Sequence, residues 1–295
     1  MRNLNFFIIL ATVVSIMLAS CRILPLAMAS RSSRSGVTDS RTVQRNGHIE
    51  SRRPGPIDAS VPTCAKPRPN EVSVCRAIEQ QILASTVRLE WHIKIKNDSG
   101  SGYRFTDGNT GFATIKEGRY LVTHNHPGVP LSGLQKGELT TISVYAANGQ
   151  PIWIEGPLEA ITIVIEDPET LVLDFGSYSG EGLFGSRGMV SAESKAWESL
   201  SLQPGMEVAQ IDWDGKTAHV NWVTIEKILT ASGTPRLELA GSVRPGASGG
   251  GLFWNGYHIA NTKSQVTAYD ENKGTVLRQY SVAALNSRQV TARLQ

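Results

Sequence analysis

The sequence is poor in cysteine and has no apolar run long enough to cross a membrane. It holds three cysteines in 295 residues, and none shows the C-x-x-C or Cys/His spacing of a metal site. We therefore expect no metal and no cofactor. The apolar run from Phe6 to Leu18 is well short of the roughly twenty residues that a spanning helix needs. Neither sign of charge dominates, with 29 basic and 26 acidic residues.

The N-terminus has the features of an export signal. A positively charged start precedes the apolar run, which ends in Leu18-Ala-Ser-Cys21. That ending resembles the lipobox of bacterial lipoproteins, which implies that residues 1–21 are a signal peptide and that Cys21 is lipidated. The alternative is an ordinary secretory signal cut after Ala27-Met-Ala29. Both interpretations predict an exported protein, either a lipoprotein of the cell membrane or an extracellular protein.

The two remaining cysteines, Cys64 and Cys75, are an even pair in a chain that is expected to leave the reducing cytoplasm. Disulfides form and persist in exported proteins, so we expect these two to be joined. The bond would be structural.

Residues 22–69 are typical of a disordered basic tether. They are rich in Ser, Arg and Pro and have little apolar periodicity, so they cannot bury enough surface to offset chain entropy. The tether has nine basic and three acidic residues, whereas the chain from residue 70 onward has a net charge of −4. A basic segment beside a lipidated cysteine suits an anionic membrane surface, and a solvated spacer is the alternative. Because the folded part is mildly acidic, nucleic acid is not an expected partner.

The rest of the chain is dominated by short segments with the alternating pattern of β-strands. A helical pattern opens at Pro69-Asn-Glu71, and from Ser85 onward the apolar period changes to two. Asn148-Gly149 and Asp214-Gly215 are hairpin signals between such segments. A glycine-rich stretch from 176 to 188 separates two β-rich halves, and residues 282–294 have the pattern of a closing helix. Even spacing without βαβ alternation predicts an all-β fold.

One serine, Ser248, lies in the glycine cluster Gly246-Ala-Ser-Gly-Gly250. The cluster fits the G-x-S-x-G nucleophile elbow of α/β-hydrolases, which requires a following helix and a later catalytic histidine. Here a strand, an Asn255-Gly256 turn and a second strand follow, and the one downstream histidine is His258 inside that strand. The elbow interpretation therefore fails.

The same cluster fits the G-x-S-G-G signature of trypsin-like serine peptidases. The chain resembles this family over residues 83–285, most clearly at Ser248 and at Thr123-His-Asn-His126, whose T-x-x-H pattern matches the strand end before the family's histidine. The resemblance implies two six-stranded antiparallel β-barrels of chymotrypsin-like fold, at residues 70–180 and 181–295. It also implies Ser248 as nucleophile and His126 as general base, with the N–H groups of Gly246 and Ser248 as oxyanion hole. His124 would face elsewhere.

The acid of the triad is where this chain departs from the family pattern. The family's aspartate opens a strand between the histidine and the serine, and the matching region here is Ile165 to Asp174. Glu169 or Asp167 is the favoured acid, ahead of Asp174, and a one-residue slip would place Thr170 there. The resemblance also puts Ser242 at the base of the substrate pocket, which argues against a strict preference for Arg or Lys.

The resemblance implies an exported serine endopeptidase that acts on proteins or peptides, with a membrane contact if Cys21 is lipidated. The alternative is a catalytically inactive member of the same fold that serves as a surface binding module. The oligomeric state does not follow from the sequence.

Overall fold

The computed structural model describes residues 62–96, 103–125, 140–176, 182–230, 234–269, 275–286 and 288–294. The predicted signal peptide with Cys21, the tether as far as residue 61, and His126 lie outside these described residues. Within the described part of the chain, no helix combines the length and the apolar character that a membrane span requires.

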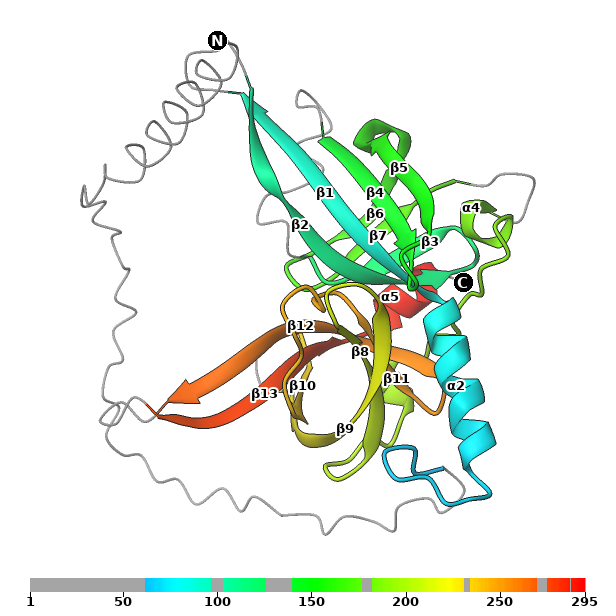
Figure 1. Ribbon diagram of the computed structural model, residues 1–295, viewed down its shortest axis with the longest axis vertical. Coiled ribbons are helices and arrows are strands. Elements are labelled where there is room, and N and C mark those ends of the chain that lie inside the picture. The colour runs from blue at the N-terminus through cyan, green and yellow to red at the C-terminus, as the bar shows by residue number, and fades with distance from the viewer. Residues whose placement is uncertain are drawn as a thin grey trace, which may run out of the picture. The chain divides into compact units, whose positions relative to one another are not determined.

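The first half is one helix and a seven-stranded antiparallel sheet (Figure 1). The strands lie in the order β5-β4-β1-β2-β3-β7-β6. The elements are α2 (Val72–Ala84), β1 (Thr86–Lys96), β2 (Tyr103–Lys116), β3 (Tyr120–Thr123), β4 (Thr140–Ala146), β5 (Pro151–Pro157), the 3-10 helix η1 (Leu158–Ala160), β6 (Thr162–Glu166) and β7 (Leu171–Asp174).

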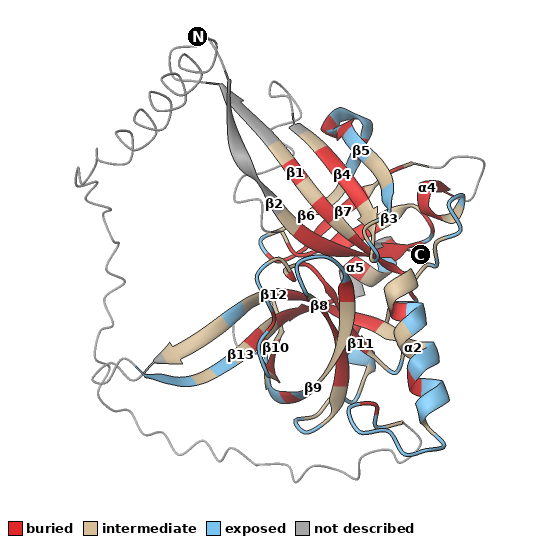
Figure 2. Ribbon diagram, viewed as in Figure 1, coloured by how far each residue is buried: buried red, intermediate tan, exposed pale blue. Residues whose placement is uncertain are grey.

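The sheet buries one face because its apolar residues alternate. On β1, Val87, Leu89 and Trp91 are at most 1% exposed, while Arg88 and Glu90 between them are only half-buried. Successive side chains of a strand point to opposite faces, so this period-two pattern places one set in the core. Figure 2 shows the resulting buried interior.

The second half closes into a six-stranded barrel in the order β10-β13-β12-β11-β8-β9 (Figure 1). Its own core holds residues such as Val208, Leu237 and Ile259, all fully buried. The elements are α4 (Gly182–Gly185), η2 (Trp197–Ser199), β8 (Glu207–Trp213), β9 (Ala218–Leu229), β10 (Arg236–Ala240), β11 (Gly251–Trp254), β12 (Tyr257–Tyr269), β13 (Val276–Leu285) and α5 (Arg288–Arg293).

The all-β class, with one β unit in each half and short helices near both ends, is confirmed. The second unit is the expected six-stranded antiparallel barrel. The first is a seven-stranded half-barrel sheet in the described residues. The closing helix is shorter than residues 282–294: the chain remains in β13 through Leu285, because Val282, Ala283 and Ala284 pair with β10 and β12, and only α5 is helical.

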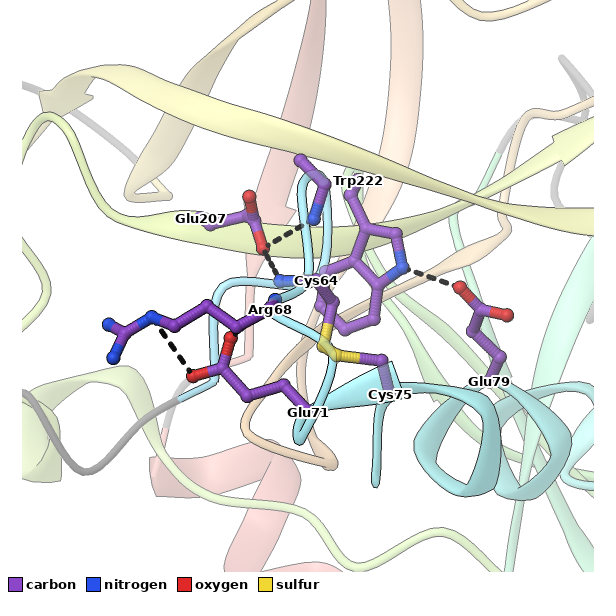
Figure 3. The surroundings of a disulfide bond; sticks show 8 residues. Cys64, Arg68, Glu71, Cys75, Glu79, Glu207 and Trp222 are labelled. Carbon is purple, nitrogen blue, oxygen red and sulfur yellow. Dashed lines mark hydrogen bonds and ion pairs between the residues drawn. A yellow bond between two sulfur atoms is a disulfide. The ribbon is translucent and has the colours of Figure 1, made fainter. Parts of the chain in front are cut away.

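The predicted disulfide between Cys64 and Cys75 is confirmed, with Cα atoms 5.4 Å apart (Figure 3). It closes the segment before α2 onto the helix, and hydrogen bonds with Glu207 and Trp222 attach this unit to the second half. The Glu207 carboxylate accepts a hydrogen bond from Cys64 N at 2.5 Å, and Trp222 Nε1 donates to Glu79 Oε1 at 2.7 Å. Residues 62–69, the end of the predicted tether, therefore lie against the folded domain.

The connection between the halves is held by a buried polar cluster. Lys116 Nζ, on β2, donates to the Ala192 carbonyl at 2.6 Å. His258, fully buried on β12, donates from Nε2 to Asn261 Oδ1 at 3.1 Å, and its Nδ1 accepts from Asn286 Nδ2 at 3.3 Å. Burial, reinforced by the charge of Lys116, lowers the pKa of His258 to about 3. The imidazole is therefore neutral in the folded protein at ordinary pH.

Candidate active site

Ser248 lies in a tight turn between β10 and β11. Gly246 has φ +95°, in the left-handed region that favours glycine. Ala247 N donates to the Arg244 carbonyl at 3.1 Å, and Gly250 N donates to the Ala247 carbonyl at 3.0 Å. The N–H groups of Gly246 and Ser248 have no acceptor among the residues that the structure describes. Two unengaged N–H groups, one on each side of Ala247, can bind an oxyanion.

The serine turn is fixed against the first half of the chain. Phe112 N, on β2, donates to the Ser248 carbonyl at 2.8 Å, and Gly249 N donates to the Thr262 carbonyl at 2.7 Å. A Cβ atom at Gly249 would lie 2.1 Å from Thr123 Oγ1 and 2.3 Å from the Phe112 carbonyl oxygen. Only glycine fits so close an approach. The turn thus contacts the strand that leads to the predicted base.

Trp213, at the end of β8, lies on the other side of the turn. A Cβ atom at Gly246 would approach Trp213 Cδ1 to 3.1 Å, so the indole ring lies against the backbone of this residue. The ring also makes an edge contact with Phe112, with centroids 5.5 Å apart, and the Arg88 guanidinium lies 5.4 Å from it. Aromatic residues from both halves therefore enclose the turn. No local pattern in the sequence marks this contact.

The end of β3 brings the histidine segment to the β6–β7 turn. His124 is buried, and its Nδ1 lies 2.8 Å from the Glu169 carbonyl oxygen. Because a carbonyl only accepts, Nδ1 carries the proton. Asn125 Nδ2 donates to the Asp167 carbonyl at 2.6 Å. Thr123, buried beside Gly249, donates to the Phe112 carbonyl at 2.6 Å. The chain then continues to His126, outside the described residues.

The candidate acids lie in three different environments. Asp174, at the far end of β7, is ion-paired with Arg119 and is opposite Tyr120 at the start of β3. Asp167 uses its Oδ1 to accept from the N–H groups of Glu169 and Thr170, at 2.8 and 2.6 Å, so its carboxylate stabilises its own turn. Glu169 alone of the three directs a buried carboxylate toward the second barrel.

Lys263, on β12, links Glu169 to the serine turn. Its Nζ donates to Glu169 Oε1 at 2.6 Å, and its carbonyl oxygen accepts from Ser248 Oγ at 3.2 Å. Arg236, the first residue of β10, also donates to Glu169 Oε1. Neither basic residue was a candidate in the sequence, and no motif there marks them.

The two basic residues keep Glu169 ionised. Burial raises the pKa of the Glu169 carboxyl, but the hydrogen bonds and charges of Lys263 and Arg236 outweigh it, so the pKa lies below its ordinary value. The carboxylate is 7% exposed at the side chain. No group of three His, Cys, Asp or Glu residues in the described ranges is arranged to hold a metal ion.

A hollow of about 140 Å³ lies beside Ser248. It is lined by the Val243–Gly246 segment, by Ser248 and by three polar residues of β12, Thr262, Ser264 and Gln265. Ser242, which the resemblance puts at the base of the pocket, is exposed and does not line this hollow, although its neighbour Val243 does.

No protein-family model matches the chain, and neither does any curated protein sequence. Several solved structures are similar. An HtrA-type protease solved with a decapeptide gives a TM-score of 0.49 at 14% identity, covering 71% of this chain and 62% of that chain. The structure of Deg5 gives 0.47 at 18%, covering 68% and 88%. A protease from M. tuberculosis in its active form gives 0.47 at 15%, covering 82% and 91%. In its own architecture, with a half-barrel, a closed six-stranded barrel and the serine turn held between them, the chain has the chymotrypsin-like fold of serine peptidases.

Proposed function

We propose that the protein is an exported serine endopeptidase with Ser248 as nucleophile, His126 as general base and Glu169 as the acid that orients the imidazole. Ser248 Oγ attacks the carbonyl carbon of the scissile peptide bond while its proton passes to His126. The N–H groups of Gly246 and Ser248 receive the negative charge on the carbonyl oxygen. The C–N bond breaks as His126 gives the proton to the leaving amine. Water, activated by His126, then hydrolyses the acyl-enzyme.

The pair of unengaged N–H groups beside the Ser248 hydroxyl is the observation that carries this proposal. Two N–H donors without a protein acceptor, one on each side of Ala247 and beside a serine hydroxyl, are what an oxyanion hole requires. The positive φ of Gly246 produces this arrangement. It also explains why a residue with a side chain is disfavoured at that position.

Glu169 is favoured over Asp167 and Asp174 because of its surroundings. The Asp167 carboxylate accepts hydrogen bonds within its own turn, and the Asp174 carboxylate is ion-paired with Arg119. Glu169 is ionised and buried, and it is bonded to Lys263, whose own carbonyl oxygen accepts a hydrogen bond from the Ser248 hydroxyl. An acid that stabilises an imidazolium needs to be ionised and held in place.

The hollow beside Ser248 is the proposed site for the substrate side chain that precedes the scissile bond. No carboxylate lines it among the described residues. We therefore expect no strict preference for Arg or Lys at this position, which agrees with the neutral residue at 242.

Export and membrane attachment are part of the proposal and depend on the N-terminal sequence alone. The apolar run and Leu18-Ala-Ser-Cys21 support a lipid anchor on Cys21. The basic residues that follow it would then lie near an anionic membrane surface. A mass measurement on the mature N-terminus tests this: a diacylated Cys21 supports the anchor, and a terminus at Ser30 contradicts it.

Hydrolysis of a mixed set of fluorogenic peptides tests the proposed activity. We expect wild type to cleave some of them and Ser248→Ala to lose about a thousandfold or more of that rate. Ser201→Ala, an exposed serine between η2 and β8, is the matched control and should keep wild-type rates. Equal rates for wild type and Ser248→Ala would contradict the proposal. A folded wild type that cleaves nothing would favour a binding module.

A further inference from the structure

The carboxylate of Glu169 joins the two β units of the chain through ion pairs. Glu169 comes from the β6–β7 turn of the first half, while its partners Arg236 and Lys263 come from strands β10 and β12 of the second. Both partners contact the same oxygen, Oε1. The two partners are 67 and 94 residues away from Glu169 in the sequence. We call Glu169, Arg236 and Lys263 the carboxylate clamp.

The second oxygen of Glu169 is buried and has no hydrogen-bond donor in the described part of the chain. His124 Nδ1 is 4.0 Å from Oε2, but its proton is donated to the Glu169 carbonyl at 2.8 Å. A buried carboxylate oxygen without a donor is costly, and each such group in a folded protein calls for an explanation. Oε2 is therefore an acceptor that remains available to a further donor.

An ordinary ion pair between the two halves would account for only part of this arrangement. One cation neutralises the carboxylate, and buried ion pairs contribute little net stability once desolvation is counted. The clamp has two cations on one oxygen, which leaves a local excess of positive charge. Such an excess favours the ionised acid, and the shared contact on Oε1 fixes which oxygen remains open.

We propose that Arg236 and Lys263 are positioning residues of the peptidase, which hold Glu169 as an anion and direct its Oε2 to the N–H group of the general base. This inference rests on the proposed function, because the base is His126. Lys263 has a second role, since its carbonyl oxygen accepts from Ser248 Oγ. One residue of β12 therefore fixes both the acid and the nucleophile.

The clamp makes a specific prediction about pH. Among the described residues, the charged or titratable groups that face Glu169 are His124 from the end of β3, Arg236 from β10, Lys263 from β12 and Asp167 within its own turn. When either cation is lost, part of what lowers the pKa of Glu169 is removed while the burial that raises it remains, so the pKa rises. A protonated Glu169 cannot stabilise an imidazolium, so activity on the acid side is lost at a higher pH.

The experiment compares Lys263→Met and Arg236→Met with wild type, measuring kcat and KM separately from acid to weakly alkaline pH. We expect kcat to fall with KM little changed, and the acid limb of kcat/KM to move up by about one to three pH units. The charge-preserving variants Lys263→Arg and Arg236→Lys should restore the acid limb toward wild type. Lys227→Met removes the ion pair that an exposed lysine makes with Glu238 in the same barrel, and it is the matched control. It should leave the profile unchanged.

The thermal midpoint of each variant is measured alongside. If a Met variant does not fold, Lys263→Gln or Arg236→Gln takes its place, because it retains a hydrogen-bond donor without the charge. The inference would be overturned if the folded variants that lack one charge had a lower thermal midpoint but the same acid limb as wild type. The clamp would then be a purely structural ion pair. Failure of the proposed function is distinguishable, because wild type would then be inactive at every pH.

Discussion

The amide of Phe112 donates a 2.8 Å hydrogen bond to the carbonyl of Ser248. This bond joins a strand of the first sheet to the turn that carries the proposed nucleophile. It brings the serine turn next to Thr123, the last residue of β3, which precedes the histidine segment in the sequence.

Gly249→Ala should disrupt this junction. The new Cβ atom would lie 2.3 Å from the Phe112 carbonyl oxygen, a backbone atom that cannot move aside, at a φ of +79°. A left-handed backbone costs a residue with a side chain about 1–2 kcal/mol. We expect Gly249→Ala to lose clearly more stability than this, and to lose activity as well. Gly256→Ala is the matched control, because its φ is +80° and nothing lies within 4 Å of the new atom. Urea unfolding of both variants checks this, and equal losses would show that the close approach is unimportant.

Separate substitution of His126 and His124 tests which histidine is the base. Nδ1 of His124 donates to a backbone carbonyl, so this ring stabilises the β6–β7 turn. We expect His126→Ala to lose about a thousandfold or more of kcat, as removal of a triad member does. His124→Ala should mainly lower the thermal midpoint, with a smaller loss of kcat. If His124→Ala abolished turnover while His126→Ala stayed active, the assignment of the base would be reversed.

His258 should make the protein sensitive to acid. Its pKa is about 3 in the folded protein, against 6.5 for an unperturbed histidine, so the unfolded chain binds the proton more readily. The stability that it contributes is complete above pH 6.5 and is lost as the pH falls from there toward 3, by up to about 1.4 kcal/mol per pH unit. Urea unfolding at several pH values between 6.5 and 3 gives the slope of the free energy of unfolding against pH. In His258→Asn this slope should be smaller than in wild type by the contribution of one proton. His92→Asn, a half-buried histidine of β1, is the control. Equal slopes for wild type and His258→Asn would rule out this role.

Much of the fold could be predicted from local patterns. Asn148-Gly149 and Asp214-Gly215 indicate hairpins, and β4–β5 and β8–β9 are hairpins in the structure. The disulfide followed from cysteine count and expected export. These features depend on residues close together in the chain or on composition, which is why the sequence is sufficient for them.

Other features depend on tertiary contacts that no local pattern records. Residues 282–285 are rich in alanine and suit a helix, yet pairing with two neighbouring strands holds them in β13. Glu169 was a candidate by its position, but Arg236 and Lys263 meet it from 67 and 94 residues away. A lysine in an alternating strand is ordinarily a solvated side chain. Only the closed barrel shows that this one reaches a buried carboxylate.

The reactivity of Ser248 tests most directly whether this residue is the nucleophile. Folded wild-type protein is treated with a fluorophosphonate, digested, and analysed by mass spectrometry to locate the adduct. We predict one phosphonylated site, at Ser248, with no adduct in Ser248→Ala and full labelling in Ser201→Ala. An adduct at another residue, or no adduct on folded wild type, would contradict it.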